Sequence, residues 1–223
     1  MDVKKLSFEQ LRDNYLSGVY DFESDEEMEA GDELFNKLID IKDLIPLLES
    51  KNETSVSAAS YIAQEAGSRS RPIFPILLKL LKSEWGRVRY EVCYSFGECA
   101  TESEHYLTLL SHLEDPYEPI RLLVISGFMN LDEDSLSSLI DFVKKDKKHQ
   151  ELVYGLSLLL QAKANTVDFG EIKESIINGN RPQKIFSYLA GYLQFKDAKK
   201  VDELVRLAND ADIFAHREKW RDY

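Results

Sequence analysis

Two stretches of the chain repeat one another at a fixed distance. The segment VRYEVCYSFGE begins at Val88 and the segment IRLLVISGFMN begins at Ile120, an offset of 32 residues. The same offset leads back from Val88 to Val56 and forward from Ile120 to Leu152, so one apolar column runs through four positions. A repeat of this length predicts stacked helix pairs, because a single pair cannot bury its apolar face alone.

Helix breakers and capping residues divide the chain into successive helix pairs. The predicted pairs are 43–50 with 54–66, 71–82 with 86–100, 103–113 with 119–131, 134–144 with 150–162 and, more loosely, 169–178 with 182–194, followed by a last helix over 198–209. A helix over 7–18 and a second one opening near Ser24 precede them, each with capping-box spacing. No segment alternates in the manner of a strand.

We therefore expect an all-α chain with three regions. Residues 1–40 form N-terminal helices with an acidic stretch, residues 41–209 form a repeat array of about five helix pairs, and residues 210–223 form a tail that docks or stays mobile.

An arginine opens the second helix of two successive pairs. Arg89 follows Val88 and Arg121 follows Ile120, while Asp115 lies six residues before Arg121. This arrangement resembles HEAT-like repeats over roughly residues 40–195. The resemblance implies a right-handed α-solenoid whose second helices line the concave surface. It also implies that the arginine reaches back to the acidic turn residue.

The resemblance is weaker in the first and fourth pairs. Ser57 and Val153 take the place of the arginine there, so a ladder of arginines would be interrupted. HEAT-like solenoids serve many unrelated functions, so the fold alone does not select one.

The charge of the chain favours some partners over others. It carries 40 acidic and 28 basic residues, a formal net charge of −12. Such a field repels nucleic acids and anionic membranes and attracts basic proteins. No apolar run is long enough for a transmembrane helix, and the first residues lack a secretory signal pattern. We expect a cytoplasmic protein with a basic protein partner that binds neither nucleic acid nor a membrane.

The sequence offers little for catalysis, metal binding or cofactor binding. His105 and His112 are two helical turns apart, too far for one ion, and no glycine-rich loop follows a strand. Cys93 and Cys99 fall in one helix, where a cysteine is usually a small buried apolar group. We therefore expect no metal site, no cofactor and no enzymatic activity.

Acidic and aromatic residues are the remaining candidates for a partner-binding site. Tyrosine offers a large contact area with a polar tip. One candidate surface lies on the second helices: Tyr61, Glu65, Tyr90, Glu91, Tyr94, Glu98 and Tyr154. The other lies in the stretch from Asp21 to Glu33, which has eight acids and no base, and is represented by Asp25, Glu26 and Glu27. The alternatives are that the tyrosines only cap helix packing and that the acids form a solvated helix start.

In fold, size and charge the chain resembles the HEAT-type immunity proteins of bacterial toxin systems, which bind and block a cognate toxin. The resemblance implies a non-catalytic module that sequesters a basic protein by occlusion. A generic adaptor or assembly scaffold is one alternative. A HEAT-like DNA glycosylase or lyase is another, but it needs a basic concave face. The dense basic run here, Lys144 to Lys148, lies at a predicted turn and is interrupted by Asp146.

Overall fold

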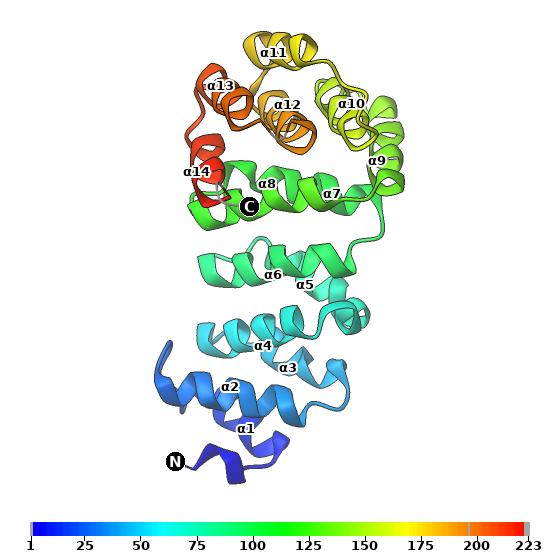
Figure 1. The fold of residues 1–223 in the computed structure, drawn as a ribbon. Coiled ribbons are helices and arrows are strands. Elements are labelled where there is room, and N and C mark those ends of the chain that lie inside the picture. The colour runs from blue at the N-terminus through cyan, green and yellow to red at the C-terminus, as the bar shows by residue number, and fades with distance from the viewer. Residues whose placement is uncertain (1, 196, 221–223) are drawn as a thin grey trace. The chain divides into compact units, whose positions relative to one another are not determined.

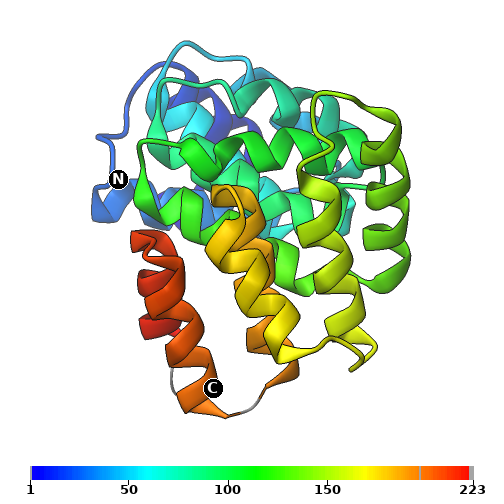
Figure 2. The ribbon, with the colours of Figure 1, turned by 90° about the horizontal axis from the view of Figure 1, so that it is seen from above.

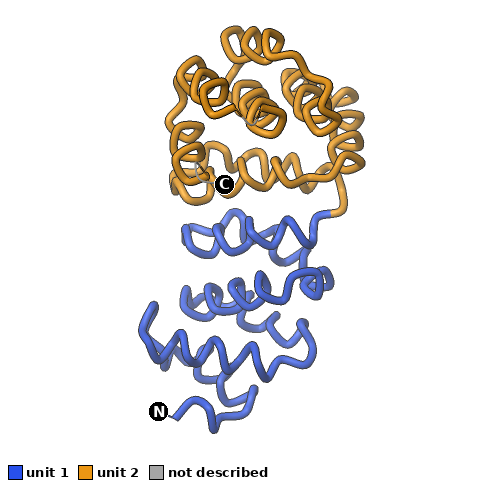
Figure 3. Tube along the Cα trace, viewed as in Figure 1, with its two compact units in different colours: residues 1–100 blue, residues 101–223 orange. Residues whose placement is uncertain are grey.

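The computed structural model describes residues 2–195 and 197–220, which fold into helices joined by short turns (Figure 1). Within these ranges no strand forms, which confirms the prediction of an all-α chain. None of the helices there is long and apolar enough to cross a membrane. The chain divides into two compact units between Ala100 and Thr101 (Figure 3).

Unit 1 is a stack of helices in two layers. Its helices are α1 (Phe8–Leu16), α2 (Asp25–Lys37), α3 (Ile45–Leu48), α4 (Glu53–Glu65), α5 (Phe74–Leu80) and α6 (Gly86–Cys99), with 3-10 turns η1 (Val3–Lys5), η2 (Ile41–Leu44) and η3 (Gly67–Ile73). α2, α4 and α6 form one layer, in which α4 contacts both neighbours, and α1, α3 and α5 form the other (Figure 1). The helices lie close to the predicted ranges, but the first helix of each repeat pair is shorter.

Prolines account for the shortened first helices. Pro46 lies in the first turn of α3, Pro72 lies within η3 and Pro75 lies in the first turn of α5. Proline has no main-chain N–H and fits only the first turn of an α-helix. The preceding residues therefore form 3-10 turns, and regular α-helix begins only at the proline-containing turn.

Local caps fix where the N-terminal helices begin. Ser7 and Gln10 form the predicted capping box, in which each side chain bonds the other residue's main-chain N–H. Ser24 accepts from the N–H of Glu27 at 3.1 Å. The Glu27 side chain does not complete the second box, because it is turned inward toward Tyr15.

Unit 2 contains the remaining helix pairs. Its elements are α7 (Ser103–Leu110), η4 (Ser111–Glu114), α8 (Glu118–Asn130), α9 (Glu133–Lys145), α10 (Leu152–Lys163), α11 (Phe169–Asn178), α12 (Arg181–Gln194), α13 (Ala198–Ala208) and α14 (Ala211–Lys219). α12 packs between α10, α11 and α13, and it also contacts α8.

The C-terminal tail is a helix of unit 2. α14 packs against α8 and α13 and buries Ile213, His216 and Arg217 (Figure 1, Figure 2). Of the two alternatives left open by the sequence, docking is therefore the one observed for residues 211–219. Residues 221–223 of the predicted tail lie outside the described residues.

The repeat column forms part of the core. Val56, Val88, Ile120 and Leu152 are all buried, each near the start of the second helix of its pair. Removing each such side chain from water contributes about 1.5–3 kcal/mol to folding. The 32-residue spacing thus marks equivalent core positions in successive pairs.

The repeat arginines reach back to main-chain oxygens of the preceding turn. Arg89 donates to the main-chain oxygens of Ser83 (2.8 Å) and Glu84 (3.1 Å). Arg121 donates to the main-chain oxygen of Asp115 at 2.7 Å. The Asp115 carboxylate instead accepts from its own turn, and the carboxylate partner of Arg121 is Asp212. The expected pairing of Arg121 with the Asp115 side chain is therefore wrong.

Candidate partner-binding face

The acidic and aromatic candidates gather mainly on α2, α4 and α6 of unit 1, which we call the α2–α4–α6 face. These helices form one layer because their opposite sides bury the apolar residues that contact α1, α3 and α5. Nine of the ten predicted site residues lie on this layer: Asp25, Glu26, Glu27, Tyr61, Glu65, Tyr90, Glu91, Tyr94 and Glu98. Both surfaces considered from the sequence thus belong to one layer of unit 1.

Tyr154 does not join this group. It lies on α10 of unit 2, where it is exposed and its hydroxyl donates to Glu171 at 3.2 Å. From the sequence, Tyr154 was grouped with the tyrosines of α4 and α6 because it lies in the second helix of its own pair. We leave it out of the face, because it belongs to the other compact unit.

The acidic stretch divides into surface and buried groups. Asp25 and Glu26 are exposed in the first turn of α2, where negative charge also favours the helix dipole. Glu27 is buried, and the Tyr15 hydroxyl donates to its main-chain oxygen at 2.7 Å and lies 3.2 Å from its Oε1. Burial raises the pKa of Glu27. The prediction that Glu27 is a surface contact is wrong, because its side chain holds α1 against α2.

The glutamates of α4 and α6 divide in the same way. Glu65 and Glu98 are exposed, so both can meet a partner. Glu91 is only 7% exposed. It interacts electrostatically with Tyr61 and Glu65 of α4, so it lies on the side of α6 that faces α4. The expectation that Glu91 is an exposed residue of the partner-binding surface is therefore wrong.

Burial also alters the chemistry of Glu91. It raises the pKa of the carboxyl to about 6, an effect that Arg87 opposes and Glu65 reinforces. The nearest cation is the Nε of Arg87, 3.8 Å from Glu91 Oε1. Among the described residues the carboxylate accepts no hydrogen bond. Glu91 is thus a weakly paired carboxylate that is largely shielded from solvent.

The aromatic candidates differ in accessibility. Tyr94 is 51% exposed on α6, whereas Tyr61 and Tyr90 are partly buried. Burial is the main cause of the raised pKa of Tyr61, and the charges of Glu65, Asp32 and Glu91 add to it. Tyr61 therefore lies among carboxylates from all three helices of the face. Tyr94 is the predicted tyrosine of this face most able to serve as an anchor.

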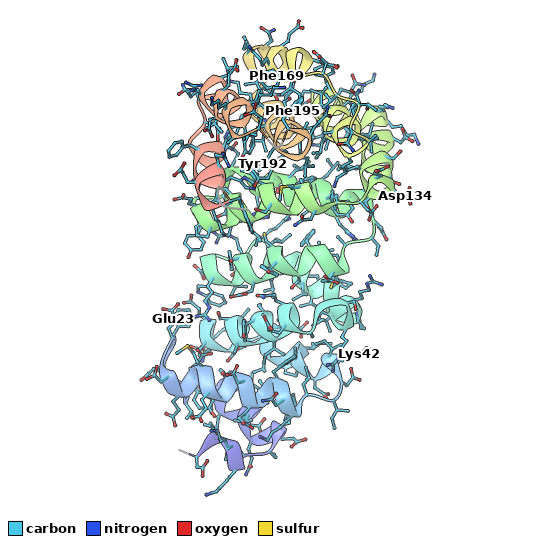
Figure 4. All side chains as sticks on the ribbon, in the orientation of Figure 1. Glu23, Lys42, Asp134, Phe169, Tyr192 and Phe195 are labelled. Atoms are coloured by element: carbon cyan, nitrogen blue, oxygen red, sulfur yellow. The ribbon has the colours of Figure 1, made fainter. Side chains whose placement is uncertain are left out.

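Four further residues of this region were not singled out from the sequence: Phe22, Glu23, Met28 and Arg87. Arg87, in the first turn of α6, bonds Glu23 at 3.1 Å and lies 5.5 Å from the ring centre of Phe22 (Glu23 is labelled in Figure 4). Met28 is 51% exposed on α2, one turn before Asp32 and hence on the side that approaches Tyr61. The contact between Arg87 and Glu91 could have been predicted, because the two residues are four apart in one helix. The contact between the 17–24 segment and α6 could not, because it depends on the tertiary fold.

The structure adds little to the case for catalysis. Across residues 2–195 and 197–220, no group of three or more histidine, cysteine or acidic side chains is arranged to hold a metal ion. Cys93 and Cys99 are buried free thiols, and burial raises the pKa of Cys99 to about 11. A thiol with such a pKa is a poor nucleophile at neutral pH.

Comparison with known proteins does not assign the chain to a family. A scan against protein-family models gives no match, and a search of curated proteins gives none either.

Proposed function

We propose that the chain is a protein-binding module whose α2–α4–α6 face receives a basic protein. The observation that carries the proposal is the composition of this face. Its exposed groups include the acids Asp25, Glu26, Glu65 and Glu98 together with Tyr94 and Met28. Arg87, the cation that projects from α6, is already paired with Glu23. Exposed apolar area bordered by one sign of charge is typical of a docking surface.

We further propose that the helix pairs are turns of a right-handed HEAT-like solenoid, with α2, α4 and α6 as second helices. The buried repeat column and the two-layer packing of unit 1 support this arrangement. On this hypothesis the face is the inner surface of the solenoid, where a partner gains contacts from several successive helices.

The most specific form of the proposal is an immunity protein that blocks a toxin by covering it. Carboxylates would speed the approach of a cationic partner, and Tyr94 would slow its release. Blocking requires only occlusion, which agrees with a face that offers carboxylates and aromatic rings. The net charge of −12 supports a basic partner over a nucleic acid.

Isolation of the protein from its native host, followed by mass spectrometry, tests this proposal. We expect a basic protein to be recovered, to be released by salt, and to lose an activity of its own when the complex forms. Exposed charges are screened within about 8 Å at physiological ionic strength, so the association should slow as salt rises. A basic partner that keeps its activity in the complex would favour an adaptor. Recovery of nucleic acid, or of an acidic protein, would contradict the proposal.

A further inference from the structure

The buried carboxylate of Glu91 lacks the partners that such a group usually has. A carboxylate removed from water is normally hydrogen-bonded or closely ion-paired, because desolvation of an unpaired charge is costly. Glu91 has Arg87 at 3.8 Å and, among the described residues, no hydrogen-bond donor. Arg87 is closer to Glu23, at 3.1 Å, and also lies over the Phe22 ring. Arg87 is therefore shared between two carboxylates, and it lies closer to Glu23 than to Glu91.

A second observation concerns the helix that covers Glu91. α4 packs along α6, and it carries two buried hydroxyls, Ser57 Oγ and Ser60 Oγ, for which the described part of the chain supplies no hydrogen-bond partner. Buried polar groups are rarely left unpaired. Ser57 and Ser60 are themselves buried within unit 1, so they are not contacts for a partner.

The charged surroundings of Glu91 come from three segments. On α6 the charge that acts on it is Arg87, and on α4 it is Glu65, with the Tyr61 hydroxyl also nearby. Glu23, from the 17–24 segment, acts through Arg87. Within unit 1, η3 and α5 also pack on α6. Their cations Arg69, Arg71 and Lys79 are exposed, and they are not among the charges that shift the pKa of Glu91.

We propose that Glu91 receives an arginine side chain of the basic partner. This inference rests on the proposed function and names the group that the face recognises. A guanidinium is planar and weakly hydrated, and it suits a partly buried carboxylate better than an ammonium does. The Glu91 side chain keeps 9% of its surface accessible, so it is not fully closed off from the solvent.

The pKa of Glu91 determines whether binding releases or takes up a proton. In the free protein its pKa is about 6, against an ordinary value of 4.5. A cation beside the carboxylate favours the charged form and lowers this pKa. Near pH 6 the free protein is therefore partly protonated at Glu91 and the complex is not, so binding must release protons and must weaken as pH falls.

The experiment uses the full-length protein and a short oligoarginine peptide as the probe, titrated by calorimetry at pH 6 in two buffers of different ionisation enthalpy. We expect proton release for the wild type. The Glu91→Gln variant should lose this release and bind about tenfold or more weakly, as expected when one partner of a buried charge pair is removed. The matched control is Glu98→Gln, which removes the same charge from an exposed site of the same helix. It should weaken binding about threefold or less and keep the proton release.

The melting temperature shows whether the Glu91→Gln variant loses binding because it unfolds. A raised carboxyl pKa stabilises the fold below pH 4.5, and this contribution is lost as pH rises through 6. At pH 7.5 the Glu91→Gln variant should therefore have a melting temperature at or above that of the wild type.

Two results would overturn the inference. If Glu91→Gln and Glu98→Gln weaken binding equally, or if Glu91→Gln retains the proton release, the proposed function stands and the role of Glu91 does not. If the wild type fails to bind the peptide even at low salt, the proposed function falls, and this inference falls with it.

Discussion

Arg121 and Asp212 lie 91 residues apart in the sequence and form a bidentate ion pair. Arg121 Nε donates to Asp212 Oδ2 at 2.8 Å, and Nη2 donates to Oδ1 at 3.0 Å. Arg181 of α12 also bonds Asp212, and it bonds Asp210 at 2.8 Å. This network joins α8, α12 and the start of α14, so it holds the C-terminal helix in unit 2.

Arg121→Ala should lower the free energy of unfolding by about 1–3 kcal/mol, because it leaves a buried carboxylate with fewer donors. It should also speed amide hydrogen exchange in α14, the helix that Asp212 helps to hold. Arg206→Ala is the control, because Arg206 is exposed and donates only to a main-chain oxygen of its own helix, at 3.3 Å. Equal effects of the two substitutions on urea unfolding and on exchange in α14 would show that the pair does not hold α14.

Two helical glycines should respond oppositely to alanine. A Cβ at Gly97 of α6 would meet no atom within 4 Å, so Gly97→Ala should stabilise the protein by about 0.5–1 kcal/mol. A Cβ at Gly155 of α10 would lie 3.0 Å from Phe186 Cβ and 3.2 Å from Gln183 Cα in α12. Because neither atom can move without its backbone, Gly155→Ala should destabilise by about 1–3 kcal/mol. Melting curves of both variants test the prediction, and a stabilised Gly155→Ala variant would refute the close packing of α10 on α12.

His216 of α14 should make the fold sensitive to acid. The ring is fully buried, and its Nδ1 lies 3.0 Å from the Tyr188 hydroxyl. Burial lowers the pKa of His216 to about 4, and Lys219 adds to this effect. The ring is therefore neutral in the fold at pH values where the unfolded chain, with a pKa of 6.5, takes up a proton. Stability is full above pH 6.5 and falls as pH drops toward 4, by up to about 3 kcal/mol.

His216→Phe tests this pH dependence, because phenylalanine is apolar, aromatic and does not titrate. Urea unfolding at pH 7.5 and pH 4.5 should show a smaller loss of stability in the variant than in the wild type. His149→Gln is the control, because His149 is partly exposed and its contact with Asp146 is local. If His216→Phe loses as much stability between pH 7.5 and pH 4.5 as the wild type does, His216 is not the source of the acid sensitivity.

Much of the helical framework could be predicted from the sequence, because its signals are local. The repeat column identified four buried positions, and Ser7 with Gln10 marked the start of α1. Burial at the edge of a helix was harder to predict. Glu91 lies beside Ser95 on the helical wheel, and only the packing of α4 decides that it is covered. Residues at such borders cannot be assigned to solvent or core from helical periodicity alone.

Contacts between distant segments could not be predicted. The resemblance to HEAT-like repeats implied that Arg121 pairs with Asp115, whereas Asp212 is the carboxylate that binds Arg121. Nothing in the spacing of the tail indicates that α14 returns to α8. The bond between Arg87 and Glu23 has the same character, since it joins the 17–24 segment to α6. Residues such as these become visible only when the fold brings the segments together.

The most direct test of the binding face is a charge reversal measured against the basic protein recovered from the host. The double variant Glu65→Lys with Glu98→Lys changes two exposed acids of the α2–α4–α6 face. The double variant Glu104→Lys with Glu174→Lys changes the net charge equally, but at exposed sites of unit 2.

Association rates of both variants and the wild type should be measured by surface plasmon resonance over a range of salt concentrations. We predict that the unit 1 variant associates about tenfold or more slowly at low salt, that the difference shrinks as salt rises, and that the unit 2 variant stays close to the wild type. Equal slowing by the two variants would mean that only net charge matters. Slowing by the unit 2 variant alone would place the binding surface elsewhere, and either result would contradict the assignment of the α2–α4–α6 face.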